Sequence, residues 1–139
     1  MKRILILCTE NSARSQIAEA LLKQMTFNRV DAISAGTDPV SVNPYTIRTL
    51  KEVGVDISNN RSKSVNEFYN QEFDFVITVC DDAHEKCPVF PGSHTKIHKS
   101  FEDPARIKGN DKTKLEAFRK VRDQIKDWLI EFIEKYQIV

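Results

Sequence analysis

Short apolar runs alternate with longer amphipathic stretches along this chain, a pattern typical of strands that alternate with helices. Residues 4–7 form a continuous apolar run, as in a strand buried on both faces of a parallel sheet. Residues 30–35 predict a second strand. Residues 73–79 give the strongest strand signal, because they hold phenylalanine, valine, isoleucine and threonine without a breaker. Residues 95–98 predict a short fourth strand.

Three amphipathic stretches predict the helices. Residues 15–25 place apolar side chains on one helical face, which predicts the first helix. The pair Asn43-Pro44 supplies an N-cap followed by proline at the first helical position, which predicts the start of a second helix. Between residues 112 and 136 an apolar side chain recurs every three or four positions, which predicts a long closing helix. The alternation indicates a single α/β domain over residues 1–139, with a mostly parallel sheet.

Composition narrows the classes of partner. The chain has 21 Lys and Arg against 20 Asp and Glu, a formal net charge of +1, which gives no reason to expect nucleic acid or an anionic membrane surface. No run approaches the roughly 20 apolar residues of a membrane span, and the first apolar run is too short for a secretory signal. We therefore expect a cytoplasmic protein, and we expect it to act as a monomer.

The chain has three cysteines, Cys8, Cys80 and Cys87. An odd number in a reducing compartment argues against a framework of structural disulfides, so each is an inert thiol, a metal ligand or a reactive thiol. Cys8 follows the first predicted strand, and Cys80 follows the strand at 73–79. Because ligands of open parallel sheets bind beyond the carboxyl ends of the strands, both cysteines are expected at the edge where chemistry occurs.

The segment from Cys8 to Ser15 joins the first strand to the first helix and places five residues between Cys8 and Arg14. A loop of this length can turn its backbone N–H groups inward, and the following helix adds its positive N-terminal end. Arg14 can bind two oxygens of a tetrahedral anion, Asn11 tolerates a positive φ, and Ser15 can hydrogen-bond the Cys8 thiolate. The predicted oxyanion-binding residues are Thr9, Glu10, Asn11, Ser12, Ala13 and Arg14.

The same positive field is expected to activate the Cys8 thiol. Lowering its pKa by roughly two units, from about 8.5, makes the thiolate the main form at neutral pH. The competing interpretation is structural, with Cys8 as a buried apolar residue at a strand end and Arg14 as a surface charge. The strand before the loop and the helix after it favour the interpretation of Cys8 as a nucleophile.

From Cys8 to Ser15 the chain resembles the low molecular weight tyrosine phosphatase fold, which carries Cys-x5-Arg-Ser near its N-terminus. Thioredoxin-coupled arsenate reductases share that fold, and four further segments look like this branch: Gln16-Ile17-Ala18-Glu19, Ser34-Ala35-Gly36, Val42-Asn43-Pro44 and Gly54-Val55-Asp56-Ile57-Ser58. The resemblance covers nearly the whole chain. It implies a three-layer α/β/α domain with a four-stranded parallel sheet, no bound cofactor, and thioredoxin as the external reductant.

The segment from Cys80 to Cys87 separates a reductase from a phosphatase, because a phosphatase does not need this pair. If the segment is helical, the two cysteines lie about 10 Å apart along the axis, and the helix must unwind before they can form a disulfide. Three interpretations compete: a redox relay with Cys8, a metal site of Cys80, His84 and Cys87 with Asp81, and unreactive thiols. The match with Cys8 favours the relay, and we expect no metal.

The resemblance implies two further sites. Asp103, which precedes a proline after the last predicted strand, is the expected general acid, although Asp-Pro also favours an ordinary turn. Reductases of this family often carry a structural potassium site, and Asn11, Glu19 and Ser34 match three of its positions. Lys63 stands where an aspartate is expected, so we predict that its ammonium takes the place of the cation.

The resemblance also implies a reaction. Arsenate, with phosphate or sulfate as analogues, binds in the loop, and the Cys8 thiolate attacks arsenic while Asp103 protonates the departing hydroxide. A relay from Cys8 through Cys80 to Cys87 then carries the disulfide outward to thioredoxin. Two alternatives stay open. One is a small phosphatase acting on phosphotyrosine or phosphoarginine, although Ala105 stands where such phosphatases usually place an aromatic residue. The other is a thiol-based redox sensor without oxyanion turnover.

Overall fold

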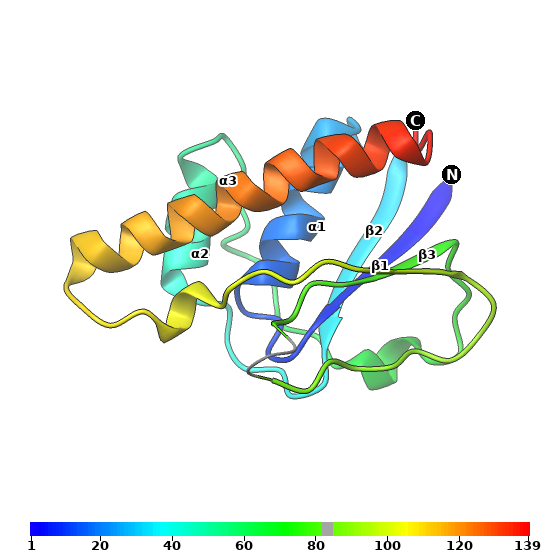
Figure 1. The fold of residues 1–139 in the computed structure, drawn as a ribbon, viewed down its shortest axis with the longest axis horizontal. Coiled ribbons are helices and arrows are strands. Elements are labelled where there is room, and N and C mark those ends of the chain that lie inside the picture. Colours follow the sequence, from blue (N-terminus) through cyan, green and yellow to red (C-terminus); the bar gives the residue numbers. More distant parts are fainter. Residues whose placement is uncertain (82–84) are drawn as a thin grey trace.

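A four-stranded sheet in which all strands are parallel forms the centre of the molecule (Figure 1). The computed structural model describes residues 1–81 and 85–139. Its strands are β1 (Lys2–Cys8), β2 (Val30–Gly36), β3 (Phe75–Thr78) and β4 (Thr95–His98), in the order β2-β1-β3-β4. The four predicted strands are confirmed, and the third is shorter at both ends than the predicted segment.

The α-helices lie together on one face of this sheet (Figure 1). They are α1 (Arg14–Met25), α2 (Pro44–Lys51) and α3 (Asp111–Lys135), and α3 packs against both of the others. The opposite face is covered by the short 3-10 helix η1 (Val65–Phe68) and by Phe90 from the segment before β4. The three-layer arrangement is therefore confirmed, with a thin outer layer on the second face.

Alternation along β1 explains why this strand is apolar at every position from Ile4 to Cys8. Ile4, Ile6 and Cys8 point to the side of the three α-helices, whereas Leu5 and Leu7 point to the side of η1. All five side chains are essentially inaccessible to solvent. A strand buried on both faces needs this continuous run, and the same alternation turns the Cys8 sulfur towards the start of α1.

The helix boundaries follow local capping rules. The side chain of Asn43 accepts a hydrogen bond from the backbone N–H of Tyr45 at 2.9 Å, which confirms the predicted N-cap before Pro44. Asn110 caps α3 in the same way through the N–H of Thr113. Among the described residues, no helix has both the length and the apolar character needed to cross a membrane.

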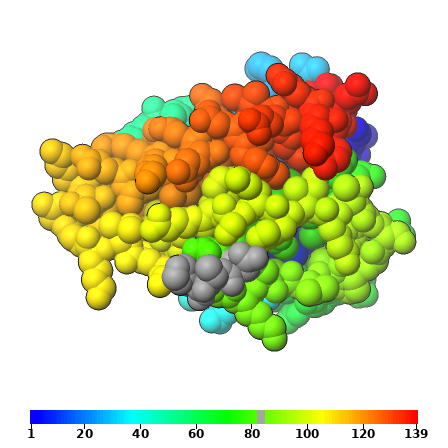
Figure 2. Space-filling model, viewed as in Figure 1, coloured from blue at the N-terminus to red at the C-terminus, as the bar shows by residue number. Residues whose placement is uncertain are grey.

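The closing helix α3 packs against the segment that follows β4. In the space-filling view α3, coloured orange to red, lies along the yellow and green stretch that includes β4 and the 3-10 helix η2 (Pro104–Arg106) (Figure 2). The contact between α3 and η2 holds η2 near the carboxyl ends of the strands (Figure 1). The order in which successive strands join the sheet reverses between β1 and β3, and ligands of open parallel sheets bind beyond the strand ends at such a point.

Gly36 closes the end of β2 beneath the loop that follows β1. It pairs with Cys8 in the sheet register, and a Cβ added at this position would lie 2.5 Å from the carbonyl oxygen of Thr9 and 3.0 Å from the backbone nitrogen of Asn11. Real Cβ atoms do not approach backbone atoms so closely, so a larger residue here must displace the loop.

The variant Gly36→Ala is expected to destabilise the fold by about 1–3 kcal/mol, the usual cost of overpacking, and to displace the loop at Thr9 and Asn11. Denaturant unfolding measures the first effect. Thr37→Ala, at the exposed next position, is the matched control and should leave the free energy of unfolding unchanged. Equal stability of Gly36→Ala and the parent protein would contradict the close approach.

Candidate active site

Asn11 holds the loop between β1 and α1 in shape. It is fully buried and has a φ of +51°, which confirms the predicted positive φ. Its side-chain oxygen accepts hydrogen bonds from the backbone N–H of Lys63 at 2.8 Å and from the side chain of Gln16 at 3.1 Å. Its side-chain nitrogen donates to the hydroxyl of Ser15 at 2.7 Å. One asparagine thus ties the loop to the start of α1 and to the segment before η1.

The Cys8 sulfur lies inside this loop. The Ser15 hydroxyl is 2.8 Å from the sulfur, and the backbone N–H of Asn11 donates to the sulfur at 3.3 Å. Because the Ser15 oxygen already accepts a hydrogen bond from Asn11, its own hydrogen is free to point at the sulfur. Two donors therefore converge on the atom that must carry negative charge, and the predicted contact between Ser15 and Cys8 is confirmed.

Burial raises the pKa of the Cys8 thiol, and this effect outweighs the hydrogen bond from Ser15 and the positive charge of Arg14. The sequence prediction of a lowered pKa is therefore wrong for this conformation. The loop and the arginine were identified correctly, but the sequence does not show that the sulfur would be 2% exposed. Excluding water from a thiolate costs more than these two contacts return in the present state of the site.

Arg14 is the buried cation of the site, only 3% exposed. One of its nitrogens donates to the backbone oxygen of Phe101 at 3.2 Å, and another lies 3.8 Å from a carboxylate oxygen of Asp103. The other Asp103 oxygen accepts a hydrogen bond from the backbone N–H of Ala105 at 3.0 Å, as the N-cap of η2. The structure thus brings together Cys8, Arg14 and Asp103, which come from three parts of the chain.

The remaining loop residues divide into buried and exposed members. Ser12 and Ala13 are buried, and the Ser12 carbonyl accepts hydrogen bonds that anchor the loop to the start of α2. Thr9 is partly exposed, and Glu10 lies at the surface. Partial burial, followed by the negative charge of Asp103, raises the pKa of Glu10. Five of the six predicted binding residues lie in the loop between β1 and α1, and Arg14 is the first residue of α1; their contacts with an oxyanion remain a prediction.

Glu85 is the functional residue that the sequence did not reveal. Its carboxylate binds Arg14 through both oxygens, accepts a hydrogen bond from the Thr9 hydroxyl at 3.1 Å, and accepts another from the backbone N–H of Asp81 at 2.7 Å. Burial opposes ionisation of this carboxyl, but the hydrogen bond from Arg14 and the other donors lower the pKa of Glu85 below its ordinary value. No pattern in the sequence pairs Glu85 with Arg14, because 71 positions separate them.

Cys80 and Cys87 form a disulfide, with their Cα atoms 5.9 Å apart. This separation is below the roughly 10 Å expected along a helix axis between them and lies within the range that a disulfide requires. Cys80 is fully buried and Cys87 is partly exposed, whereas Cys8 is a free thiol. Because the N–H of Val79 bonds to the carbonyl of Leu7, the chain reaches Cys80 beside the end of β1.

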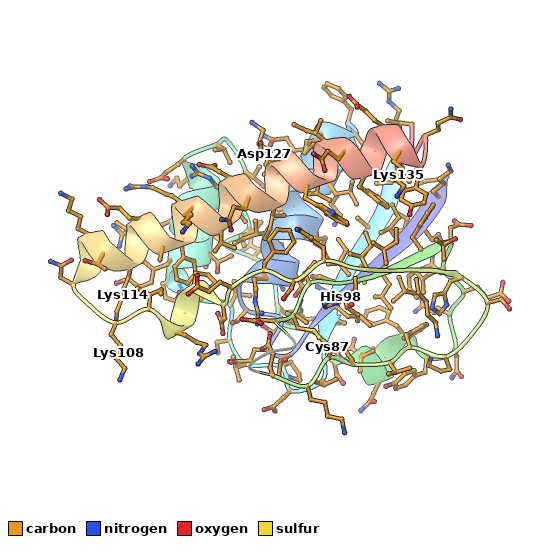
Figure 3. The ribbon with its side chains drawn as sticks, viewed as in Figure 1. Cys87, His98, Lys108, Lys114, Asp127 and Lys135 are labelled. Carbon is orange, nitrogen blue, oxygen red and sulfur yellow. A yellow bond between two sulfur atoms is a disulfide. The ribbon has the colours of Figure 1, made fainter. Side chains whose placement is uncertain are left out.

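His98 is the histidine that the structure places near the disulfide. Possible ligand atoms of Cys80, Cys87 and His98 lie within 4.8 Å of one another, and Figure 3 shows Cys87 and His98 in the same region. The metal site considered from the sequence used His84 instead, and His84 lies outside the described residues. Metal ligation needs thiolates, which the two sulfurs do not offer while they are bonded to each other.

Lys63 places its ammonium beside Glu19, one of the residues that match the family's potassium site. Its ammonium lies 3.6 Å from Glu19, and the same carboxylate oxygen of Glu19 accepts hydrogen bonds from the backbone N–H and the hydroxyl of Ser34 at 2.7 and 3.0 Å. The ammonium also donates to the carbonyl of Arg61 at 3.4 Å. These residues do not fit a potassium ion, since a side-chain cation already pairs with the carboxylate.

Replacing Ser15 by alanine is expected to raise the pKa of Cys8 further, by about 1–2 pH units, because a hydrogen bond to a charged group contributes about 1.5–3 kcal/mol. The pH dependence of iodoacetamide alkylation measures this in a Cys80→Ser, Cys87→Ser background, in which Cys8 alone reacts. The exposed Ser41→Ala is the control. An unchanged pH midpoint for Ser15→Ala would show that the hydroxyl does not donate to the thiolate.

Exchanging sodium chloride for potassium chloride at equal concentration is expected to leave the Tm unchanged, because the Lys63 ammonium already neutralises Glu19. Lys63→Ala should cost about 1–3 kcal/mol by leaving a buried carboxylate short of a partner. Lys23→Ala, which removes a more exposed ammonium 3.3 Å from the same carboxylate, should cost less than about 1 kcal/mol. A potassium-specific rise in Tm of the parent protein would overturn this assignment.

Comparison with known proteins agrees with this geometry. The chain matches the family described as low molecular weight phosphotyrosine protein phosphatase over residues 3–137. It is 41% identical over 133 residues to an arsenate reductase of Bacillus subtilis, with 96% of both chains covered. It is similar to the solved structure "An arsenate reductase in the phosphate binding state", with a TM-score of 0.81, 32% identity, and coverage of 97% of this chain and 98% of that one.

A third similar protein is a thioredoxin-dependent arsenate reductase of Corynebacterium glutamicum, with a TM-score of 0.73 and 26% identity; the match covers 99% of this chain and 62% of that one. Fold, loop and sequence similarity all point to the same group of enzymes. This chain belongs to the low molecular weight phosphotyrosine protein phosphatase family.

Proposed function

We propose that this protein reduces arsenate to arsenite, with Cys8 as the nucleophile, Cys80 and Cys87 as a disulfide relay, and thioredoxin as the reductant. The observation that carries the proposal is the Cys80–Cys87 disulfide at the strand ends that also hold the Cys8 loop. Phosphoryl transfer needs one cysteine, whereas a two-electron reduction needs a place for the resulting disulfide. The named arsenate reductases among the similar proteins support the same activity.

The first step is formation of a bond between sulfur and arsenic. Arsenate binds in the loop, where Arg14 and backbone N–H groups meet its charge. The Cys8 thiolate attacks arsenic, and one oxygen leaves as hydroxide, which Asp103 protonates to water. The distance of 3.8 Å between Arg14 and Asp103 supports this role, because it keeps the acid beside the bound anion.

The second step transfers two electrons. The Cys80 thiolate attacks the Cys8 sulfur, the bond between sulfur and arsenic breaks, and its electron pair stays on arsenic, which leaves as arsenite. The Cys87 thiolate then attacks the Cys80 sulfur and releases Cys8 as a thiolate. The product is the Cys80–Cys87 disulfide, which is the state present in the structure.

Thioredoxin closes the cycle by reducing that disulfide. Cys87 is the more exposed of the two sulfur-bearing residues and lies close in sequence to Val89, which is 77% exposed. A partner thiolate can therefore reach Cys87, whereas Cys80 is enclosed. Continuous turnover requires a compartment that keeps thioredoxin reduced, so the proposal places the protein in the cytoplasm.

A phosphatase is the second candidate, since the constellation of Cys8, Arg14 and Asp103 also suits phosphate esters. Ala105 follows the Asp103-Pro104 pair, and its methyl group offers no ring to stack on an aromatic ester. The disulfide has no task in that reaction. We therefore expect phosphate ester hydrolysis only as a side activity.

The test is arsenate-dependent NADPH oxidation with thioredoxin and thioredoxin reductase, measured beside hydrolysis of an aryl phosphate. Cys8→Ser is expected to abolish NADPH oxidation. Cys87→Ser should release arsenite once per protein molecule and then stop, because its disulfide cannot move outward. Sustained turnover by Cys87→Ser would contradict the order of the relay. Fast aryl phosphate hydrolysis that needs Cys8 alone, without NADPH oxidation, would establish the phosphatase instead.

A further inference from the structure

The carboxylate of Glu85 fills the binding face of Arg14. Two guanidinium nitrogens each donate to a different oxygen of this carboxylate, one of them at 3.0 Å, in the paired geometry that arginine uses for carboxylates and phosphates. Arg14 is 3% exposed and the Glu85 side chain 18% exposed, so this is an enclosed ion pair and not a surface contact. A tetrahedral oxyanion in the loop needs the same two nitrogens.

Two more donors hold the carboxylate at this place. The Thr9 hydroxyl, from the oxyanion loop itself, donates to one oxygen at 3.1 Å. The backbone N–H of Asp81, the residue after Cys80, donates to the other oxygen at 2.7 Å. Glu85 therefore bridges the loop that is expected to bind arsenate and the segment that carries the disulfide.

The disulfide and the position of Glu85 belong to one conformation. Glu85 lies two residues before Cys87, and the bond to Cys80 closes this segment into a loop with its ends 5.9 Å apart. Within that closed loop the N–H of Glu85 bonds to the carbonyl of Asp81 at 3.0 Å while the side chain turns back to Arg14. Breaking the disulfide removes the covalent link that keeps the ends of this loop together.

We infer that Glu85 is an internal anionic ligand of the oxyanion site, which it occupies while Cys80 and Cys87 are disulfide-bonded. This inference rests on the proposed function and adds a redox control of substrate binding to it. The oxidised protein rejects arsenate and phosphate because its own carboxylate already neutralises Arg14. Reduction by thioredoxin opens the loop, withdraws Glu85 and restores the anion site, so substrate binds only to protein that has thiols ready for the relay.

Calorimetric titration with inorganic phosphate tests this inference without turnover. Oxidised protein, in which Cys8 is the free thiol, should bind phosphate at least about tenfold more weakly than reduced protein, because a charge-assisted pair must first be broken. In the oxidised state Glu85→Gln should recover at least about tenfold in affinity. The same variant should bind like the parent protein once both are reduced.

Two controls separate the carboxylate from general effects. Glu102→Gln removes the same charge from an exposed neighbour of the site and should leave phosphate binding unchanged in both redox states. A Cys80→Ser, Cys87→Ser protein cannot close the loop, so it should bind phosphate like the reduced parent, and adding Glu85→Gln should change nothing. Equal phosphate affinity of the oxidised and reduced parent proteins, or no gain in oxidised Glu85→Gln, would overturn the inference.

The outcome is distinct from that of the proposed function. If arsenate drives NADPH oxidation but Glu85→Gln does not improve phosphate binding to the oxidised protein, the inference is wrong and the reductase stands. If Glu85→Gln opens the oxidised site as expected while arsenate drives no NADPH oxidation, the inference stands as a redox gate on an anion site, and the reductase assignment is wrong.

Discussion

A guanidinium that is 3% exposed must have an anion beside it, and the rest of this site is arranged around that constraint. An unpaired Arg14 at this depth would cost several kcal/mol. In the present state Glu85 supplies the charge, Asp103 lies nearby at 3.8 Å, and the carbonyl of Phe101 accepts a further hydrogen bond from the guanidinium. During catalysis the proposed oxyanion takes the same place. On this proposal, substrate binding exchanges one anion for another.

The burial that encloses Arg14 also sets the pKa of Cys8. The thiol lies in the same enclosed region, and its pKa is raised because burial of the sulfur outweighs its stabilising contacts. The hydrogen bonds from Ser15 and from the N–H of Asn11 are already in position, so activation of Cys8 needs no rebuilding of the loop.

Several segments that are distant in the sequence hold the shape of the loop between β1 and α1. Asn11 connects it to α1 and to the segment before η1, and Gly36 lets the backbone of Thr9 pass directly over the end of β2. Lys63 contributes twice, through its backbone N–H to Asn11 and through its ammonium to Glu19. This ammonium is attached to the chain, so Glu19 has a counter-charge without an ion from solution.

Local features of the amino-acid sequence were enough to identify the strands, the helices and the loop from Cys8 to Ser15, because apolar periodicity, capping residues and Cys-x5-Arg spacing depend on neighbouring residues. The sequence also indicated that Cys80 and Cys87 form a pair that acts together with Cys8. The contacts of Arg14 with Glu85 and with the carbonyl of Phe101, and the burial that raises the pKa of the Cys8 thiol, became visible only in the folded chain. These features depend on contacts between segments about 70 or more positions apart and on how much water the fold excludes, and neither quantity is encoded in local pattern.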